Sequence, residues 1–257
     1  MNNTEEPSPA KIEKVKKFIP HFEKLCLEYV RPILFGELPL ISREPVLKGA
    51  TITFVNTGSN SFGITDYHVF EKYLELKNKL KNFRCQIDNL TFDLESRLID
   101  YNSDSNIDLA TFKINDDEFR LMSAKPLHHK SWPVKLKNET KTEPVFILGF
   151  PGHLRSITST TNIMAAYVSL LLTIETINDN QIGIVLRREN WTTIFKTSKP
   201  VDLSKFRGIS GAGVFRMNNI VPELLGIVTD HSENLDILLC TRSDILTNEG
   251  NINLQHK

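Results

Sequence analysis

The stretch Gly208-Ile-Ser-Gly-Ala-Gly-Val-Phe215 carries the most information about the fold of this chain. Ser210 stands between Gly208 and Gly211, so it occupies a turn with little side-chain bulk. Such a turn presents a hydroxyl group and backbone N–H groups to the same point in space. A serine hydroxyl is a poor nucleophile alone, so a chemical role for it needs a base and a group that orients the base.

Candidates for both groups lie upstream. His68 closes the segment Phe62–His68, and Asp108 opens the segment Asp108–Ile114, whose apolar alternation is typical of a strand entering a core. Asp104 is the nearest rival carboxylate, but the strand pattern begins directly after Asp108, which favours Asp108. The chain order is therefore histidine, aspartate, serine.

These segments resemble the chymotrypsin-like (trypsin-like) serine peptidases, whose catalytic residues follow this order. The resemblance covers roughly Val46 to Ser243. Five segments carry it in the expected order: Thr65–His68 resembles Thr-Ala-Ala-His, Ile107–Ala110 resembles Asn-Asp-Ile-Ala, Val145–Gly152 resembles the first strand of the second barrel, Gly208–Gly211 resembles Gly-Asp-Ser-Gly, and Leu225–Asp230 resembles the strand lining the substrate cleft.

The resemblance implies an all-β fold of two six-stranded antiparallel β-barrels with an N-terminal helical extension. We expect the extension in residues 1–32, the barrel carrying His68 and Asp108 in residues 33–130, and the barrel carrying Ser210 in residues 131–257. The extension should begin at Ser8-Pro9, an N-cap followed by proline, with an interruption near Pro20.

Short apolar segments with turn signals between them also indicate an all-β protein. A helix is expected over Val69–Lys81, a turn at Asn178–Gln181, and the link between barrels within Asn115–Thr142. The expected strands are Pro45–Val55, Ser61–Ile64, Phe83–Thr91, Leu109–Ile114, Phe146–Phe150, Ala165–Thr176, Ile182–Arg188, Val214–Arg216, Leu224–Thr229 and Ile237–Thr241.

The resemblance implies a serine endopeptidase that works through an acyl-enzyme. Ser210 is then the nucleophile, His68 the general base, and Asp108 the group that orients the imidazole. The N–H groups of Gly208 and Ser210 form the oxyanion hole. Thr229 stands where the family has a serine whose hydroxyl supports the triad aspartate.

Substrate-binding positions follow from the same resemblance. Ser204 occupies the floor of the primary pocket, where trypsins have an aspartate, and this argues against strict Lys or Arg cleavage. Arg207 flanks the pocket and favours acidic neighbours or is a solvated loop charge. Thr229, Asp230 and His231 are expected to pair with an extended protein or peptide substrate.

Composition limits the partners and the compartment. Lys plus Arg equals Asp plus Glu, 31 against 31, so no net field favours nucleic acid or an anionic membrane. Three widely spaced cysteines and no visible secretory signal indicate a reducing, cytoplasmic location. No Cys or His pair has metal-ligand spacing, so neither a metal nor another cofactor is expected. A regulatory protein partner is compatible with the resemblance.

Two departures from the family pattern leave an alternative open. Ile209 replaces the aspartate that pairs with a freed amino terminus, so activation by zymogen cleavage is not expected. Asp66 and Tyr67 replace two small residues before the histidine, so packing around the base must differ. The alternative is a catalytically silent module that binds peptides in its cleft. An α/β-hydrolase is disfavoured, because that motif needs glycine where this chain has Ala212.

Overall fold

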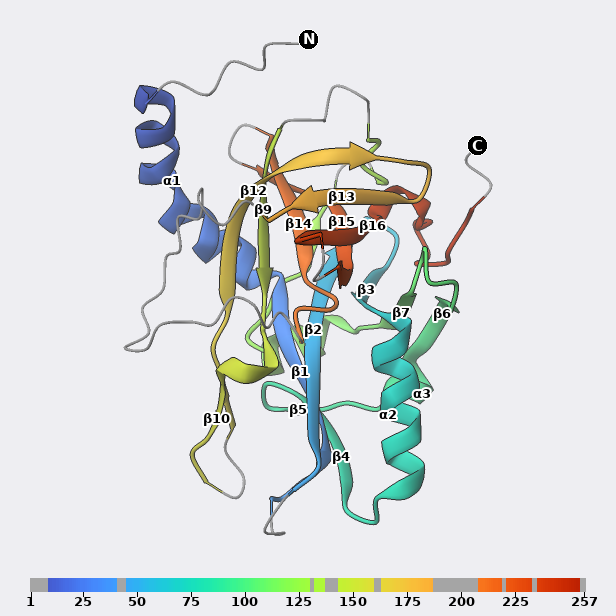
Figure 1. The fold of residues 1–257 in the computed structure, drawn as a ribbon. Helices are drawn as coiled ribbons and strands as arrows, with labels where there is room; N and C mark the ends of the chain where they lie inside the picture. Colours follow the sequence, from blue (N-terminus) through green and yellow to red (C-terminus); the bar gives the residue numbers. More distant parts are fainter. Residues whose placement is uncertain are drawn as a thin grey trace.

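The computed structural model describes residues 9–40, 45–129, 132–136, 143–159, 163–186, 208–218, 221–232 and 235–254, with the backbone alone for residues 9–17. It is mostly β, with two antiparallel sheet systems that lie one above the other (Figure 1). The N-terminal strands form the lower system in that view, and the C-terminal strands form the upper one.

The C-terminal half confirms one of the two expected barrels. Six strands close in the order β12-β13-β16-β15-β14-β9. Their bounds are β9 Pro144–Gly149, β12 Val168–Ile177, β13 Gln181–Val185, β14 Gly213–Asn218, β15 Val221–Ser232 and β16 Ile237–Arg242. Buried aliphatic side chains fill the interior, including Ile147, Ile184 and Val214. The N–H of Asn178 bonds the carbonyl of Gln181 at 2.9 Å, which is the expected turn between β12 and β13.

The N-terminal half does not confirm a second six-stranded barrel. Seven strands are ordered β5-β4-β1-β2-β3-β7-β6, and β8 pairs in parallel with β2. β5 and β6 are the two edges of this sheet, and the chain between them forms α3. No described ladder joins the two edges, so the sheet does not close into a barrel. The bounds are β1 Val30–Glu37, β2 Leu47–Asn56, β3 Ser61–Thr65, β4 Phe83–Ile87, β5 Leu90–Thr91, α3 Leu94–Arg97, β6 Leu98–Asn102, β7 Leu109–Lys113 and β8 Leu127–His128.

Two longer helices pack beside the sheets. α1 (Pro9–Glu28) contains Pro20 and continues past it. The helix changes direction along its length (Figure 1), so the expected extension is one bent helix and not two separate ones. Ser8, its expected N-cap, lies outside the described residues. α2 (Tyr67–Lys79) confirms the expected helix and buries Val69, Phe70, Tyr73 and Leu76 against the first sheet.

Short elements complete the connections between these parts. They are α4 Asp116–Leu121, η2 Gly152–Leu154, the hairpin of β10 Arg155–Ile157 and β11 Ile163–Ala165, and η4 Ser243–Ile245. Both α4 and β8 lie within the segment expected to link the two halves of the chain. None of the described helices is long and apolar enough to cross a membrane.

A shared apolar core joins the two sheet systems. Phe62 and Ile64 of β3 belong to the same buried cluster as Leu148 of β9 and Ile227 of β15. The three cysteines are buried free thiols and form no disulfide. The seam between the sheets is therefore held by packing, and the loops that follow β3 and precede β7 and β14 are brought to one place.

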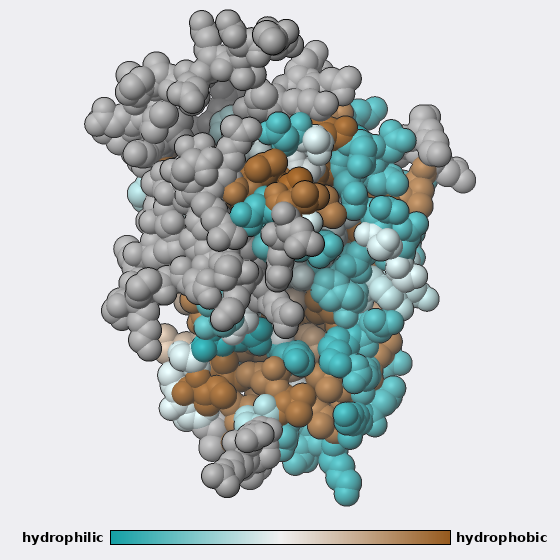
Figure 2. Space-filling model, viewed as in Figure 1, coloured by the Kyte–Doolittle hydropathy of each residue, from teal (hydrophilic) through white to brown (hydrophobic). Residues whose placement is uncertain are grey.

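Exposed apolar residues gather in more than one place on the face shown in Figure 2. Apolar residues gather in the lower part of that face, where Figure 1 shows the β10 hairpin. Ile157 and Met164 of this hairpin are exposed by 56% and 63%. Polar side chains cover most of the right-hand side of the same view.

Candidate active site

The first turn of α2 positions His68. Thr65 ends β3, Asp66 is the N-cap residue of α2, and His68 follows within the first helical turn. The backbone of Thr65 is buried, and its hydroxyl donates to the carbonyl of Thr51 at 2.7 Å. The end of β3 is therefore anchored to β2, and this anchor sets where the imidazole emerges.

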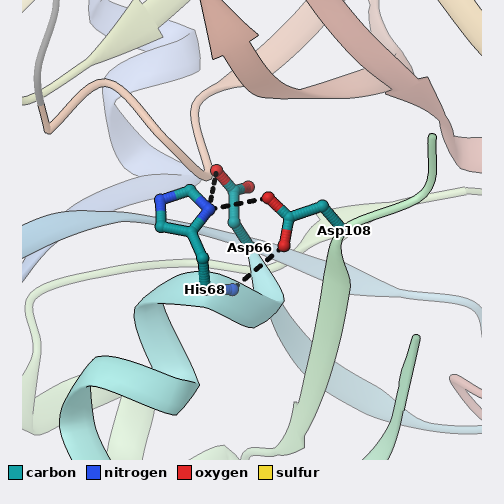
Figure 3. A group of neighbouring side chains, drawn as sticks. All are labelled: Asp66, His68 and Asp108. Atoms are coloured by element: carbon teal, nitrogen blue, oxygen red, sulfur yellow. Dashed lines mark hydrogen bonds and ion pairs between the residues drawn. The ribbon is translucent and has the colours of Figure 1, made fainter. Parts of the chain in front are cut away.

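Asp108 binds His68 in two places. Its Oδ2 lies 2.6 Å from the ring Nδ1 of His68, and its Oδ1 accepts the backbone N–H of His68 at 3.0 Å (Figure 3). Asp108 has φ of 44°, in the left-handed region that Asp tolerates better than most residues. The structure thus brings these two expected residues together, with Nδ1 turned to the carboxylate and Nε2 turned away from it.

The electrostatic surroundings raise the proton affinity of His68. Burial acts to lower the pKa of the imidazole, but the hydrogen bond to Asp108 and the nearby carboxylates of Asp66, Asp108 and Asp230 raise it to about 9. The side chain of His68 is 50% exposed, so Nε2 can receive a proton from a reactant. An imidazole with raised basicity is a strong proton acceptor once it is neutral.

Ser210 lies in the loop that precedes β14, and hydrogen bonds to the backbone carbonyls of that loop hold it to the first sheet. The N–H of Thr51 donates to the carbonyl of Ser210 at 2.8 Å, and the hydroxyl of Thr53 donates to the carbonyl of Gly211 at 2.8 Å. Ala212 closes the turn through its N–H to the carbonyl of Ile209 at 2.8 Å. These bonds place the serine beside the cluster around His68.

Ser210 and His68 are not hydrogen-bonded to each other within the described part of the chain. Ser210 does lie near Asp66, because its hydroxyl acts on the pKa of that carboxyl. Gly208 and Gly211 have φ of 95° and 86°, which shapes the turn as a glycine turn. In the same described part, no backbone hydrogen bond occupies the N–H of Gly208 or Ser210.

The hydroxyl of Thr229 does not support Asp108 among the described residues. Thr229 is 3% exposed, and its Oγ1 donates to the carbonyl of Leu239 at 3.3 Å. A residue that sequence reasoning missed acts nearby: Thr241 donates its hydroxyl to the carbonyl of Ile107 at 2.6 Å, directly before Asp108. Thr241 gave no signal beyond its place in an apolar strand.

The strand expected to pair with substrate has a free edge. β15 pairs with β14 only as far as Ile227, whereas Asp230 and His231 pair on their other side with β16. Val228 still exchanges backbone hydrogen bonds with Gly211 and Ala212, each of 2.9 Å. Beyond Val228, no described strand pairs with the edge of β15 that faces away from β16. Asp230 is exposed there, and Ser204 and Arg207 lie outside the described residues.

Asp66, His68 and Asp108 also carry potential metal-ligand atoms, all within 4.8 Å of one another. The 2.6 Å between Nδ1 of His68 and Oδ2 of Asp108 is the length of a charge-assisted hydrogen bond. Two ligands of one tetrahedral zinc ion, with bonds of about 2.0 Å, lie about 3.3 Å apart. The arrangement therefore fits a shared proton better than a metal ion.

No family model matches the chain, and no curated protein matches it. Among solved structures it is similar to a protease from M. tuberculosis in its active form, with 14% identity over 93% of this chain and 84% of that one and a TM-score of 0.47. It is also similar to a Glu endopeptidase in complex with MPD, with 12% identity, 82% and 84% coverage and a TM-score of 0.44.

A third similar structure is the serine protease domain of the Sesbania mosaic virus polyprotein, with 10% identity, 82% and 87% coverage and a TM-score of 0.42. The names of these three structures describe a protease, an endopeptidase and a serine protease domain.

Proposed function

We propose that this protein is a serine endopeptidase in which Ser210, His68 and Asp108 form a catalytic triad at the seam between the first sheet and the closed barrel. The observation that carries the proposal is the double contact from Asp108 to His68, through Nδ1 at 2.6 Å and the backbone N–H at 3.0 Å. This contact orients the imidazole with Nε2 free, which is the arrangement a general base requires.

The reaction would proceed in two stages. Nε2 of His68 accepts the proton of the Ser210 hydroxyl while Oγ attacks the peptide carbonyl, and the same proton then passes to the leaving amine. Water hydrolyses the acyl-enzyme with His68 again acting as base. The N–H groups of Gly208 and Ser210 stabilise the oxyanion, in support of which neither donates to another described backbone group.

The substrate would be an extended protein or peptide segment. Thr229, Asp230 and His231 belong to the part of β15 beyond Val228, where no described strand pairs with the edge that faces away from β16, and we expect a substrate strand to add to the sheet there. Asp230 is exposed at this edge and favours a basic or neutral neighbour over an acidic one. We also propose Ser204 and Arg207 as residues of the pocket that binds the substrate side chain. A regulatory protein is a further proposed partner.

A fluorophosphonate probe tests the reaction directly, because it reacts with an activated serine. We expect one covalent adduct on the wild-type protein by intact mass, and none on the Ser210→Ala or His68→Ala variants. Ser156→Ala is the matched control, since Ser156 is an exposed serine on β10. Comparison of protein termini in cells expressing wild type or Ser210→Ala then identifies substrates.

The alternative is a catalytically silent peptide-binding module. The observation in its favour is that Ser210 and His68 do not share a hydrogen bond within the described chain. Absence of labelling at Ser210, together with binding of extended peptides that is weakened by changes at Asp230, would establish this alternative and reject the peptidase.

A further inference from the structure

Asp66 occupies a helix N-cap position without acting as a cap. It precedes α2 with φ of −78° and ψ of 149°, yet its side chain makes no capping hydrogen bond. Aspartate at this position normally accepts an N–H of the first turn. Here the carboxylate of Asp108 accepts the N–H of His68 instead. The side chain of Asp66 is thereby released to point towards the interior, at the imidazole (Figure 3).

The carboxyl group of Asp66 is fully buried and has no hydrogen-bond partner among the described residues. The hydroxyl of Ser210 and the N–H of Gly211 lie close enough to lower its pKa, but neither reaches hydrogen-bonding geometry, and the N–H of Gly211 donates to Val228 at 2.9 Å. A buried carboxylate without partners is costly, so burial raises the pKa of Asp66 well above its usual value.

Titratable groups on three other segments face the pair formed by Asp66 and His68. Asp108 precedes β7 and Asp230 lies on β15, and both raise the pKa of His68. Cys240 of β16 also lies near Asp66, and burial holds this thiol neutral by raising its pKa. Oδ2 of Asp66 is 3.9 Å from Nδ1 of His68. Among these groups, the His68 imidazolium is therefore the one that can carry a positive charge.

Two arrangements of this cluster contain the same number of protons. In one, Asp66 is a neutral carboxylic acid and His68 is a neutral imidazole. In the other, Asp66 is a carboxylate and His68 is an imidazolium. Desolvation of Asp66 and its repulsion from Asp108 favour the first, whereas attraction between opposite charges 3.9 Å apart favours the second. Groups coupled this closely titrate together.

We propose that Asp66 and His68 hold one proton between them, and that Asp66 is a positioning residue that sets the basicity of the imidazole. To pass from the first arrangement to the second, the Asp66 carboxyl loses its proton to solvent and Nε2 of His68 takes up a proton from solvent. Nδ1 keeps its hydrogen bond to Asp108 in both arrangements. Only the arrangement with neutral His68 can accept the serine proton. The expected effect of Asp66 on the reaction rate rests on the proposed peptidase function. The sharing of a proton between Asp66 and His68 does not depend on that function.

Nuclear magnetic resonance of the full chain tests the proposal without requiring activity. The Ser210→Ala variant is labelled with ¹³C and ¹⁵N, and the ring nitrogens of His68 and the carboxyl carbon of Asp66 are followed from acidic to alkaline pH. We expect both signals to change over the same two steps. In Ser210→Ala with Asp66→Asn, His68 should titrate in a single step, at a pKa lower by roughly one unit or more.

The matched control is Asp179→Asn, which removes an exposed carboxylate from the turn after β12 and should leave the titration of His68 unchanged. Asp66→Ala replaces Asp66→Asn if the latter does not fold. Independent titration of Asp66 and His68, or an unchanged pKa of His68 in both Asp66 variants, overturns the proposal. If the fluorophosphonate probe does not label Ser210 while the signals of Asp66 and His68 still change together, the proposed peptidase function is rejected and the shared proton is not.

In an active enzyme, the acid limb of kcat/KM should move to lower pH in Asp66→Asn by the same amount as the pKa of His68. A loss of folding stability alone lowers the rate without moving this limb. A limb that stays in place while the rate falls assigns Asp66 a packing role and contradicts the proposal.

Discussion

The backbone N–H of Thr51 donates a hydrogen bond of 2.8 Å to the carbonyl oxygen of Ser210. The side chain of Thr51 adds two more bonds across the same seam, because its Oγ1 accepts the N–H of Phe150 at 2.9 Å and donates to the carbonyl of Gly208 at 3.2 Å. One residue of β2 thus fixes both ends of the serine turn. The geometry of the candidate nucleophile depends on the first sheet as much as on the barrel that carries it.

Thr51→Val should destabilise the protein by about 1–3 kcal/mol, because the buried N–H of Phe150 loses its acceptor. Thr51→Ser keeps the hydroxyl and should recover most of this free energy of unfolding. Urea denaturation of the two variants measures the difference. Equal stability of Thr51→Val and wild type would show that the hydroxyl bonds contribute nothing net.

Gly211 and Gly58 form a matched pair of left-handed glycines, with φ of 86° and 88°. A Cβ at Gly211 would lie 1.9 Å from the carbonyl oxygen of Thr51, whereas a Cβ at Gly58 meets nothing within 4 Å. Gly58→Ala should therefore cost about 1 kcal/mol for its backbone conformation alone. Gly211→Ala should cost more than about 3 kcal/mol, because a backbone group must move. Thermal unfolding compares them, and similar costs would contradict the close approach of the two sheets.

Asp108→Asn should lower kcat/KM by a factor on the order of 10⁴, because the asparagine no longer stabilises the imidazolium or holds the same tautomer. Asp104→Asn is the control, since Asp104 is exposed and its carboxylate bonds Asn106 at 2.9 Å, not His68. Its kcat/KM should stay within about tenfold of wild type. Hydrolysis of a peptide substrate measures both, and a larger loss in Asp104→Asn would exchange the roles of the two aspartates.

Activity should increase with pH through the neutral range and reach half of its maximum near the His68 pKa of about 9. The sign follows because neutral His68 accepts the serine proton, and the neutral fraction grows as pH rises through the raised pKa. Asp230→Asn should lower the midpoint slightly, since Asp230 is exposed and contributes least among the causes that raise it. A rate profile with its midpoint near pH 6.5, the ordinary pKa of histidine, would argue against these surroundings for His68.

His129 is expected to make folding sensitive to acid. Burial lowers its pKa to about 4, against a weaker opposing effect of Glu223, and its Nε2 accepts the N–H of Leu224 at 3.3 Å. As pH falls from about 6.5 to about 4, the unfolded chain binds a proton that the folded chain does not, so stability falls, by roughly 2–3 kcal/mol.

His129→Gln keeps an acceptor without a titrating group and should reduce this slope of stability against pH. His21→Gln removes an exposed histidine from α1 and serves as the control. Urea denaturation at several pH values provides the measurement. An unchanged slope in His129→Gln would assign the acid sensitivity to other groups.

Much of the secondary structure was predictable, because apolar alternation and turn residues are local signals. The strand around β7, the turn at Asn178–Gln181 and the helix after His68 are confirmed. β1 and β6 escaped prediction: β1 contains Pro32 and Gly36, which weaken the strand signal, and it is stabilised by pairing with both β2 and β4. The expected strand over Phe83–Thr91 is two strands that reverse at Asp88, whose φ is 49°.

The site was predictable in its residues and less so in its contacts. His68 and Asp108 were chosen from motifs, and the structure places them in direct contact. Thr229 was expected beside Asp108, yet its hydroxyl bonds Leu239 while Thr241 reaches the carbonyl before Asp108. Side-chain direction in a strand with a register shift after Val228 is not readable from alternation.

The sequence by itself determined the order of histidine, aspartate and serine, the glycine turn around Ser210, and the alternating strands that flank them, since each depends on neighbours in the chain. Only the tertiary structure decided that no ladder joins the edges of the first sheet among the residues described, and that Asp66 lies buried against His68. Solvent exclusion and charge proximity arise from segments far apart in sequence, so the protonation of a carboxyl group is a property of the assembled seam.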